Sequence, residues 1–250
     1  MIIKAINTKA LVPPKDDLLS IIKESFLKFK LKEKSIIVIT SKVVSIWEGR
    51  CIKISEVKNK DDLIKKEADF YIDRKNISTE CDVMLTIKNN ILIPTSGIDE
   101  SNANGYYILW PKNPFLSAKK IYDFVSKEVR LKNFGVIISD SHTTPLRTGI
   151  MGIGLAYYGF YPLRDYRGKK DIFGRKLKMT QTNIVDSLAT SAVFAMGEGA
   201  EQSPIAVIED AGDIKFGITK KDALPIDINE DIYSPILKSV KWKKGSENKK

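Results

Sequence analysis

Cysteine and histidine are scarce in this chain: its 250 residues include two cysteines and one histidine. A structural zinc site ordinarily takes four Cys or His ligands, so this composition argues against one. Cys51 and Cys81 are far apart in the sequence and lie outside any disulfide-rich pattern. We therefore expect both to be reduced, half-buried thiols in a cytoplasmic protein.

Long hydrophobic runs are also missing. No apolar stretch approaches the roughly 20 residues that a membrane-spanning helix needs. The N-terminal stretch MIIKAINTKALVPPKDD has no basic segment followed by an uninterrupted apolar segment and a small-residue cleavage site. The sequence therefore predicts no membrane partner and no secretory signal.

Arginine is rare although the net charge is +10, because the basic residues are 34 lysines and only 7 arginines. Nucleic-acid surfaces and bidentate phosphate sites favour arginine. The lysines are spread along the chain, which is typical of a solvated surface that helps to attract anionic ligands. We expect no nucleic-acid partner, and a basic RNA-binding protein is the minor alternative.

The hydrophobic pattern predicts both strands and helices. Strands are expected at 1–10, 35–40, 106–110, 135–140 and 203–210 and, as a pair joined at Asn89–Asn90, within 83–94. Helices are expected at 15–29, at 61–72, at 117–132 with Ser117 as its cap, and at 180–197, capped by Thr or Asn and ended by Gly197.

These elements follow one another without a regular βαβ rhythm, which favours an α+β (irregular α/β) fold with mixed sheets and flanking helices. The pattern weakens after about residue 210. We therefore predict a catalytic domain at 1–210 and a C-terminal extension at 211–250 with a basic, frayed tail.

Three acidic segments each follow an apolar element, at residues 98–102, 139–143 and 196–199. Carboxylate, hydroxyl and amide oxygens are the ligands that Mg²⁺ and Mn²⁺ prefer. A single acidic segment of this kind is usually a turn or a helix cap. Three such segments are a better indication of a metal site, because a sheet can bring the ends of its strands together at one rim.

Two further features could contact anions. His142 lies directly after Asp140 and Ser141, in a Thr-rich segment that ends at Arg147. Arg164 and Arg167 lie in PLRDYRGKKDIFGRKL and alternate with Asp165. His142 is either a structural histidine or a substrate contact. Arg164 and Arg167 belong either to an ion-paired loop or to a clamp for phosphate or carboxylate.

Five motifs occur together and in order: TSKVVSIWEGR (40–50), SGIDESN (96–102), GVIISDSHTTPLR (135–147), PLRDYRGKKDIFGRKL (162–177) and AMGEG (195–199). In this set the chain resembles the coenzyme F420:L-glutamate ligase family, and particularly its branch named for folate metabolism. The resemblance covers about residues 3–210.

The resemblance implies a γ-glutamyl ligase that joins L-glutamate to an acidic small-molecule acceptor, with GTP or ATP as co-substrate, Mg²⁺ or Mn²⁺ as metal, and a homodimeric assembly. It implies metal ligands at Asp99, Asp140, Ser141 and Glu198 and nucleotide contacts at Leu11, Val12, Pro13, Pro14, Ser41, Lys42, Asn102, Met196, Gly197 and Gly199. Arg147 and His142 are the candidate catalytic residues, and Arg164 and Arg167 the candidate clamp.

The chain departs from the family pattern at three places. Ile46 replaces a basic residue that often follows the Ser of the first motif, which removes one expected phosphate contact. Glu198 stands where the F420 enzymes tend to have Gln. The bulky His142 changes a loop that the F420 enzymes have in another form. The acceptor is therefore expected to be either folate-like or F420-0-like. The alternative function is a non-catalytic nucleotide- or metabolite-binding protein on the same scaffold.

Overall fold

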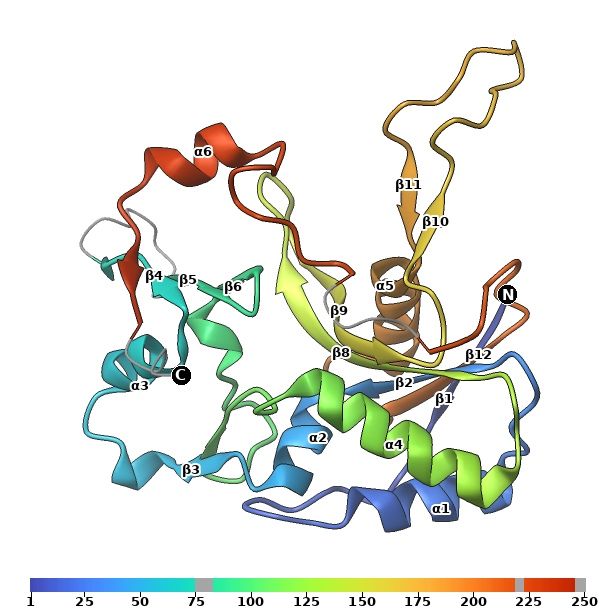
Figure 1. Ribbon diagram of the computed structural model, residues 1–250. Helices are drawn as coiled ribbons and strands as arrows, with labels where there is room; N and C mark the ends of the chain where they lie inside the picture. Colours follow the sequence, from blue (N-terminus) through green and yellow to red (C-terminus); the bar gives the residue numbers. More distant parts are fainter. Residues whose placement is uncertain (75–82, 219–222, 246–250) are drawn as a thin grey trace. The chain divides into compact units, whose positions relative to one another are not determined.

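The computed structural model describes residues 1–74, 83–218 and 223–245, which form two compact units (Figure 1). The first unit comprises residues 1–11, 17–44 and 113–224, and the second comprises residues 12–16, 45–112 and 225–250. The boundary falls within helix α2 (Ser41–Glu48).

The first unit is a five-stranded sheet in the order β1-β12-β2-β8-β9, with α1 and α4 on one face and α5 on the other (Figure 1). A two-stranded ribbon of β10 and β11 projects from it. Its elements are β1 Ile2–Ile6, α1 Leu18–Lys28, β2 Ile36–Thr40, α4 Pro114–Val129, β8 Gly135–Thr143, β9 Ile150–Tyr158, β10 Leu163–Asp165, β11 Gln181–Asn183, α5 Ile184–Met196 and β12 Ile205–Glu209.

Strand direction decides which loops of this sheet meet. β2 pairs in parallel with β8, whereas β1 with β12, β12 with β2, and β8 with β9 pair antiparallel. The carboxyl ends of β1, β2 and β8 therefore lie at one edge, together with the amino ends of β9 and β12. We call this edge the carboxyl edge of the sheet.

Helix α5 packs closely on β9 because two glycines leave room for it. A Cβ atom on Gly152 would lie 2.5 Å from the carbonyl oxygen of Ala189, and one on Gly154 would lie 2.3 Å from Val185. The Asp186 carboxylate also accepts a 2.9 Å hydrogen bond from Gly154 N. These contacts align α5 with β8, so that the C-terminal end of α5 points toward the carboxyl edge.

One hydrophobic core cluster of the first unit lies between the sheet and α5. β-Branched strand residues meet small side chains of the helix there, which permits a close approach of helix and sheet. The buried members are Ile36, Val38, Ile137, Tyr157, Phe160, Ile184, Val185, Leu188, Ala189, Ala192, Val193, Met196, Ala206 and Ile208.

The second unit contains a four-stranded sheet in the order β13-β4-β5-β6 and a two-stranded sheet of β3 and β7. Asn89 and Asn90 join β5 to β6 with positive φ angles of 50° and 60°, the geometry of a tight hairpin turn. Its elements are β3 Cys51–Lys53, the 3₁₀ turn Ile54–Glu56, α3 Lys60–Glu67, β4 Phe70–Tyr71, β5 Leu85–Lys88, β6 Ile91–Pro94, the 3₁₀ turn Thr95–Gly97, β7 Tyr106–Ile108, α6 Ser234–Ser239 and β13 Lys243–Lys244.

The predicted α+β class is confirmed, but several local predictions were wrong. Ser117 lies inside α4, because Asn113 caps the helix one turn earlier and Pro114 suits its first position. The helix predicted at 15–29 begins only at Leu18, because Asp17 is the N-cap of α1. The helix predicted at 61–72 ends at Glu67, and residues 70–71 form β4 instead.

The C-terminal extension carries more order than predicted, since α6 and β13 lie between residues 234 and 244. Residues 246–250 of the predicted tail, and Cys81, lie outside the described residues. Cys51 is half-buried, and burial raises the pKa of its thiol to about 11. Among the described residues, no helix combines the length and the apolar character that crossing a bilayer demands.

The contact between α5 and β9 generates the first prediction. Gly152→Ala should destabilise the fold by about 1–3 kcal/mol, because the new methyl group must push against the helix backbone. Thermal unfolding followed by circular dichroism measures the effect. Gly199→Ala is the matched control, since its Cβ would meet only the flexible Glu201 side chain at 3.4 Å. Equal melting temperatures for both variants would contradict this packing account.

Candidate functional site

The carboxyl edge gathers segments that are distant in the sequence. Thr8 N donates a 2.9 Å hydrogen bond to Gln202 O, and Thr40 N donates a 3.0 Å hydrogen bond to Pro204 O. The Asn7 amide adds a 2.8 Å hydrogen bond to Glu201 O. The segment that follows α5 is therefore held against the ends of β1 and β2.

Ser41 and Lys42 begin α2 directly after β2 ends at Thr40, with no intervening loop. The first backbone N–H groups of a helix have no partner within the helix, and they carry its partial positive charge. No acidic residue occupies the first turn of α2. The helix thus starts at the carboxyl edge with the electrostatic character of a phosphate-binding N-terminus.

Asp140, Ser141 and His142 lie within β8, so the strand predicted at 135–140 continues to Thr143 and the acidic segment 139–143 is not a turn. Asp140 pairs with Ile153 and Ser141 with Gly152 in β9. Neighbouring strand residues point to opposite faces. Ser141 shares the α5 face with Gly152, whereas Asp140 and His142 share the other face, so Asp140 and Ser141 do not converge side by side.

Glu198 follows the C-terminal end of α5 and lies in the segment held at the carboxyl edge. Gly197 ends the helix with a φ of +80°, and a Cβ atom there would come within 2.4 Å of the Glu201 carboxyl carbon. The Glu201 carboxylate in turn accepts a 2.8 Å hydrogen bond from Gly199 N. Met196 is buried in the core and fixes the start of this segment.

Arg147 lies in the connection between β8 and β9, where its backbone N donates a 3.2 Å hydrogen bond to Thr144 O. It is exposed. The first unit therefore brings four predicted segments to its carboxyl edge, represented by Ser41–Lys42, Asp140–His142, Arg147 and Met196–Gly199.

Arg164 and Arg167 lie elsewhere. β9 runs antiparallel to β8, so the chain that follows it leaves from the opposite edge of the sheet, where Ile184 N at the start of α5 bonds Pro162 O at 2.9 Å. Arg167 forms a 2.7 Å ion pair with Asp165. Arg164 donates to Asp213 O. Within one chain these arginines have the contacts of an ion-paired loop, at the end of α5 remote from Glu198.

The predicted residues Asp99 and Asn102 belong to the second unit. Asp99 Oδ1 accepts hydrogen bonds from Ser101 N at 2.7 Å and from Ser101 Oγ at 2.8 Å, which closes a tight turn. Asn102 and Asn104 both have positive φ angles, of 51° and 48°. Asparagine tolerates this region better than most other residues, so both residues suit the turn that they form.

Val12, Pro13 and Pro14 also belong to the second unit, whereas Leu11 belongs to the first. Val12 N donates a 3.0 Å hydrogen bond to the Asp16 carboxylate. The predicted nucleotide contacts thus divide between the two units.

Within the described ranges, no three His, Cys, Asp or Glu side chains are grouped as a metal cage would require. Magnesium commonly binds proteins through one or two carboxylates and completes its coordination with waters and substrate phosphates. Asp140 and Glu198 at the carboxyl edge are two carboxylates of the kind that bind magnesium in this way.

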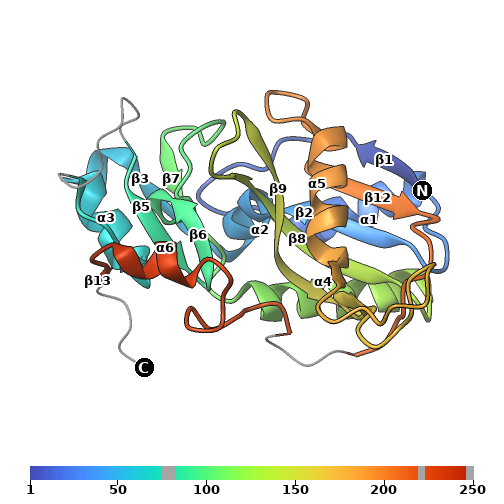
Figure 2. The same ribbon diagram turned by 90° about the horizontal axis from the view of Figure 1, so that it is seen from above.

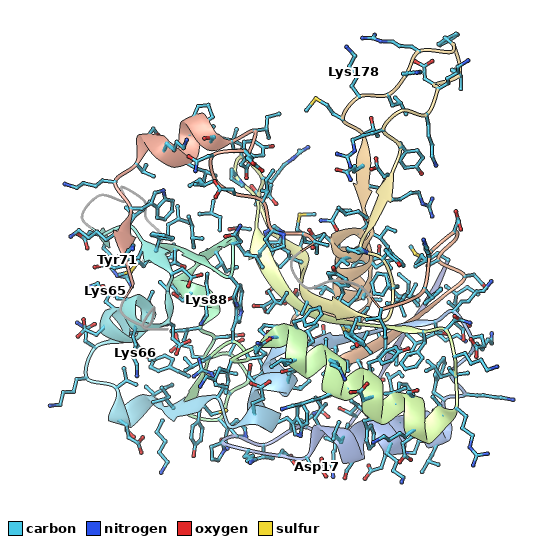
Figure 3. All side chains as sticks on the ribbon, in the orientation of Figure 1. Asp17, Lys65, Lys66, Tyr71, Lys88 and Lys178 are labelled. Atoms are coloured by element: carbon cyan, nitrogen blue, oxygen red, sulfur yellow. The ribbon has the colours of Figure 1, made fainter. Side chains whose placement is uncertain are left out.

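A buried ion cluster supports the loop of the second unit that carries Asp99. The Glu67 carboxylate lies 2.6 Å from Arg50 Nη2 and 2.5 Å from Lys88 Nζ, and Arg50 also bonds Trp110 O at 3.1 Å (Lys88 is labelled in Figure 3). The indole of Trp110 lies where a Cβ on Gly97 would be. The cluster therefore holds α3, β5 and the loop in one arrangement.

The sequence pattern at 151–163 predicted neither a strand nor a helix, so β9 was not predicted. The spacing of Gly152 and Gly154 could have indicated this strand. Two glycines one residue apart lie on the same face of a strand, and they allow a helix to approach that face closely. The predicted strand at 135–140 was also shorter than β8, because the polar residues at the end of β8 are typical of a turn.

The fold and the carboxyl edge together define a class: a mixed α+β protein whose sheet edge collects oxygen donors and a helix N-terminus from separate segments. The model of the F420-0:Gamma-glutamyl ligase family matches residues 6–210. The chain belongs to this family, as the resemblance in its motifs predicted.

Relatives with curated names agree. The Coenzyme F420:L-glutamate ligase of Methanocaldococcus jannaschii is 35% identical, over 84% of this chain and 88% of that protein. The protein of the same name from Methanococcus maripaludis strain C7 is 35% identical over 75% of this chain and 80% of its own length. The one from Methanopyrus kandleri is 31% identical over 78% and 81%.

The buried cluster generates the second prediction. Burial opposes ionisation of Glu67, but Lys88 and Arg50 outweigh it and hold the carboxyl pKa below its ordinary value of 4.5. The ionised group therefore stabilises the fold above that value, and the contribution is lost as the pH falls through the lowered pKa.

Glu67→Gln should cost about 3 kcal/mol at pH 7, because it removes the carboxylate that faces two buried cations. It should also weaken the dependence of unfolding free energy on pH below about 5. Urea titrations between pH 3 and 7 measure both effects. Glu56→Gln, in the nearby 3₁₀ turn, is the control. An unchanged slope against pH in Glu67→Gln would contradict the assignment.

Proposed function

We propose that this protein is a metal- and nucleoside-triphosphate-dependent ligase that adds L-glutamate to an acidic acceptor through an amide bond. The observation that carries the proposal is the gathering of Ser41–Lys42, Asp140 and Glu198 at the carboxyl edge of one sheet. The names of the relatives support the transfer of glutamate.

The reaction must first activate a carboxylate. An acceptor carboxylate oxygen attacks the terminal phosphorus of the nucleotide, which gives an acyl phosphate and releases the nucleoside diphosphate. The amine of glutamate then attacks the acyl carbon, phosphate leaves, and the nitrogen loses a proton. Positioning and neutralisation of charge supply most of the acceleration in such phosphoryl transfers.

The residues divide these tasks by chemistry. The N-terminus of α2 and Lys42 bind phosphate, because both carry positive charge at the carboxyl edge. Arg147 offers a guanidinium for the charge that develops on transfer. His142 shares the sheet face of Asp140 and lies within reach of a substrate bound there.

A divalent cation, Mg²⁺ or Mn²⁺, would supply charge neutralisation between the phosphate oxygens. Asp140 and Glu198 of the first unit would hold it. Asp99 and Asn102 of the second unit are separate candidates, for a metal ligand and a nucleotide contact, on the family resemblance alone. The scarcity of protein ligands fits a cation that arrives with its nucleotide.

The acceptor that we propose is F420-0-like or folate-like. The names of the relatives favour the first. The segment SDSHTTPLR favours a different acceptor, because His142 adds a bulky ring beside Asp140. A cytoplasmic location fits either acceptor, since nucleoside triphosphates are concentrated there.

A non-catalytic nucleotide-binding protein on the same scaffold is the second candidate. One observation favours it: Ile46, at the position where family members often carry a basic residue, is buried in α2. Turnover separates the two, because only a ligase hydrolyses nucleotide in a manner that depends on both glutamate and acceptor.

The third prediction concerns the carboxylates. Asp140→Asn and Asp99→Asn should each reduce glutamate addition at least 100-fold while leaving the melting temperature within about 2 °C, since each removes a metal ligand without changing its volume. Asp123→Asn, on the surface of α4 beside Lys119, is the matched control. Full activity in both variants would refute the metal assignment.

The fourth prediction concerns ligands. GTP or ATP should raise the melting temperature only together with Mg²⁺ or Mn²⁺, because binding to the folded state alone stabilises it. Mass spectrometry of reactions with F420-0 and folates should then show products heavier by one glutamate residue. Binding without any product in either reaction would favour the non-catalytic candidate.

A further inference from the structure

The second unit contains a short run of backbone in an unusual conformation. The turn Thr95–Gly97 follows β6, which lies beside β5 (Figure 2). Its three residues have successive φ angles of 53°, 57° and 68°. This left-handed region suits glycine, but it crowds the Cβ atom of other residues and is especially unfavourable for a β-branched one. Thr95 and Ser96 are therefore held in a conformation that they do not prefer.

Hydrogen bonds from neighbouring elements hold the turn in place. Thr95 N donates to Met84 O at 2.7 Å. Ser96 N donates to Thr86 Oγ1 at 2.9 Å, and Ser96 Oγ donates to Ile64 O, in α3, at 2.9 Å. Ser96 is 0% exposed. Strained backbone persists where its surroundings over-determine it, and here the buried Ser96 hydroxyl ties the turn to α3.

The indole of Trp110 packs against the same turn at Gly97. A Cβ atom on Gly97 would lie 2.1 Å from Trp110 Nε1, so no side chain fits there. Trp110 is itself buried, and its carbonyl accepts the hydrogen bond from Arg50. The turn is thus in contact with α3 through Ser96 and with the indole through Gly97.

The turn leads directly to Asp99. Ile98 N donates a 3.0 Å hydrogen bond to Thr95 O, which closes the turn, and Ile98 is buried. Asp99 N then donates to Ile108 O at 3.0 Å, and Asp99 O accepts from Ile108 N at 2.8 Å. Asp99 is half-buried. Its backbone is therefore fixed by the turn before it and by its pairing with Ile108.

We propose that Ser96 is a positioning residue, whose hydroxyl keeps the turn Thr95–Gly97 left-handed and so sets the direction in which the Asp99 carboxylate points. The inference deepens the proposed function and rests on it in one respect, the role of Asp99 as a metal ligand. A change in the hand of the turn would redirect the chain that leaves it. Groups that form a functional site must be held to within about 0.5 Å of the productive geometry.

A purely structural role is the competing account. In that account the Ser96 hydroxyl only stabilises the fold, as the buried hydroxyl of Ser25 does when it donates to Ile21 O at 2.7 Å in α1. Both accounts predict that removal of the Ser96 hydroxyl lowers the melting temperature. Only the positioning account predicts a loss of metal affinity, and only it predicts that a residue at ease with positive φ restores that affinity.

Titration with Mn²⁺ in the presence of GTP or ATP tests the proposal, with the shift in melting temperature as the readout. Ser96→Ala should raise the Mn²⁺ concentration at half of the full shift by about 10–100-fold, the range typical of residues that orient metal ligands. Asp99→Asn should raise it at least as much. Ser25→Ala is the matched control, and it should need the same Mn²⁺ concentration as the wild type although it loses a similar hydrogen bond.

Ser96→Gly is the rescue variant. It also lacks the hydroxyl, but glycine adopts positive φ without strain, so the required Mn²⁺ concentration should stay within about threefold of the wild-type value. Equal losses of affinity in Ser96→Ala and Ser96→Gly would overturn the role of the turn.

Hydrogen exchange without any ligand gives a readout that does not depend on the metal. In Ser96→Ala the N–H groups of Asp99 and Ile108 should exchange faster than in the wild type, because their pairing follows the turn. Ser25→Ala should leave both N–H groups at the wild-type rate. Unchanged protection of both groups in Ser96→Ala would overturn the proposal.

The outcomes separate this inference from the proposed function. Loss of Mn²⁺ affinity in Asp99→Asn but not in Ser96→Ala would overturn the positioning role and leave the metal assignment intact. Wild-type affinity in Asp99→Asn would overturn the metal assignment of Asp99 and this inference with it. A wild-type chain without any Mn²⁺-dependent shift would contradict the proposed metal dependence, and hydrogen exchange would then decide whether Ser96 holds the backbone of Asp99.

Discussion

The parallel pairing of β2 with β8 is the constraint on which the candidate site depends. It is the one parallel pair in a sheet whose other neighbours are antiparallel. Because of it, Thr40 and Ser139 lie side by side, and the chain after each leaves at the same edge. An antiparallel arrangement would send the start of α2 and Asp140 to opposite edges, and no phosphate could meet both.

Helix α5 brings Glu198 to the same edge through a close contact with β9, where Asp186 and Thr190 also form hydrogen bonds with the backbone of Gly154 and Gly152. Gly152 and Gly154 let the helix lie against β9, and its direction then carries Glu198 to the carboxyl edge. The same geometry sends the opposite end of α5 toward the ribbon of β10 and β11. Helix α5 therefore has Glu198 near one end and Arg164 and Arg167 near the other. Residues that the family motifs assign to one site thus lie at opposite ends of this helix.

Local patterns in the sequence predicted much of the fold because they report local physics. Asn89–Asn90 indicated the β5–β6 turn through its tolerance of positive φ, and Gly197 indicated the end of α5. The errors have local causes as well. Ser117 is a good cap, but Asn113 followed by Pro114 is a better start, and the polar end of β8 is a strand because β9 pairs with it.

The sequence by itself determined the α+β class, the family and the kinds of residue available for the chemistry, since composition, periodicity and ordered motifs are properties of the chain alone. Only the tertiary structure decided that Asp140 and Ser141 point to opposite faces, that Glu198 lies at the carboxyl edge, and that Arg164 leaves from the other one. Those placements follow from strand direction and helix packing, which depend on contacts between residues that are distant in the sequence.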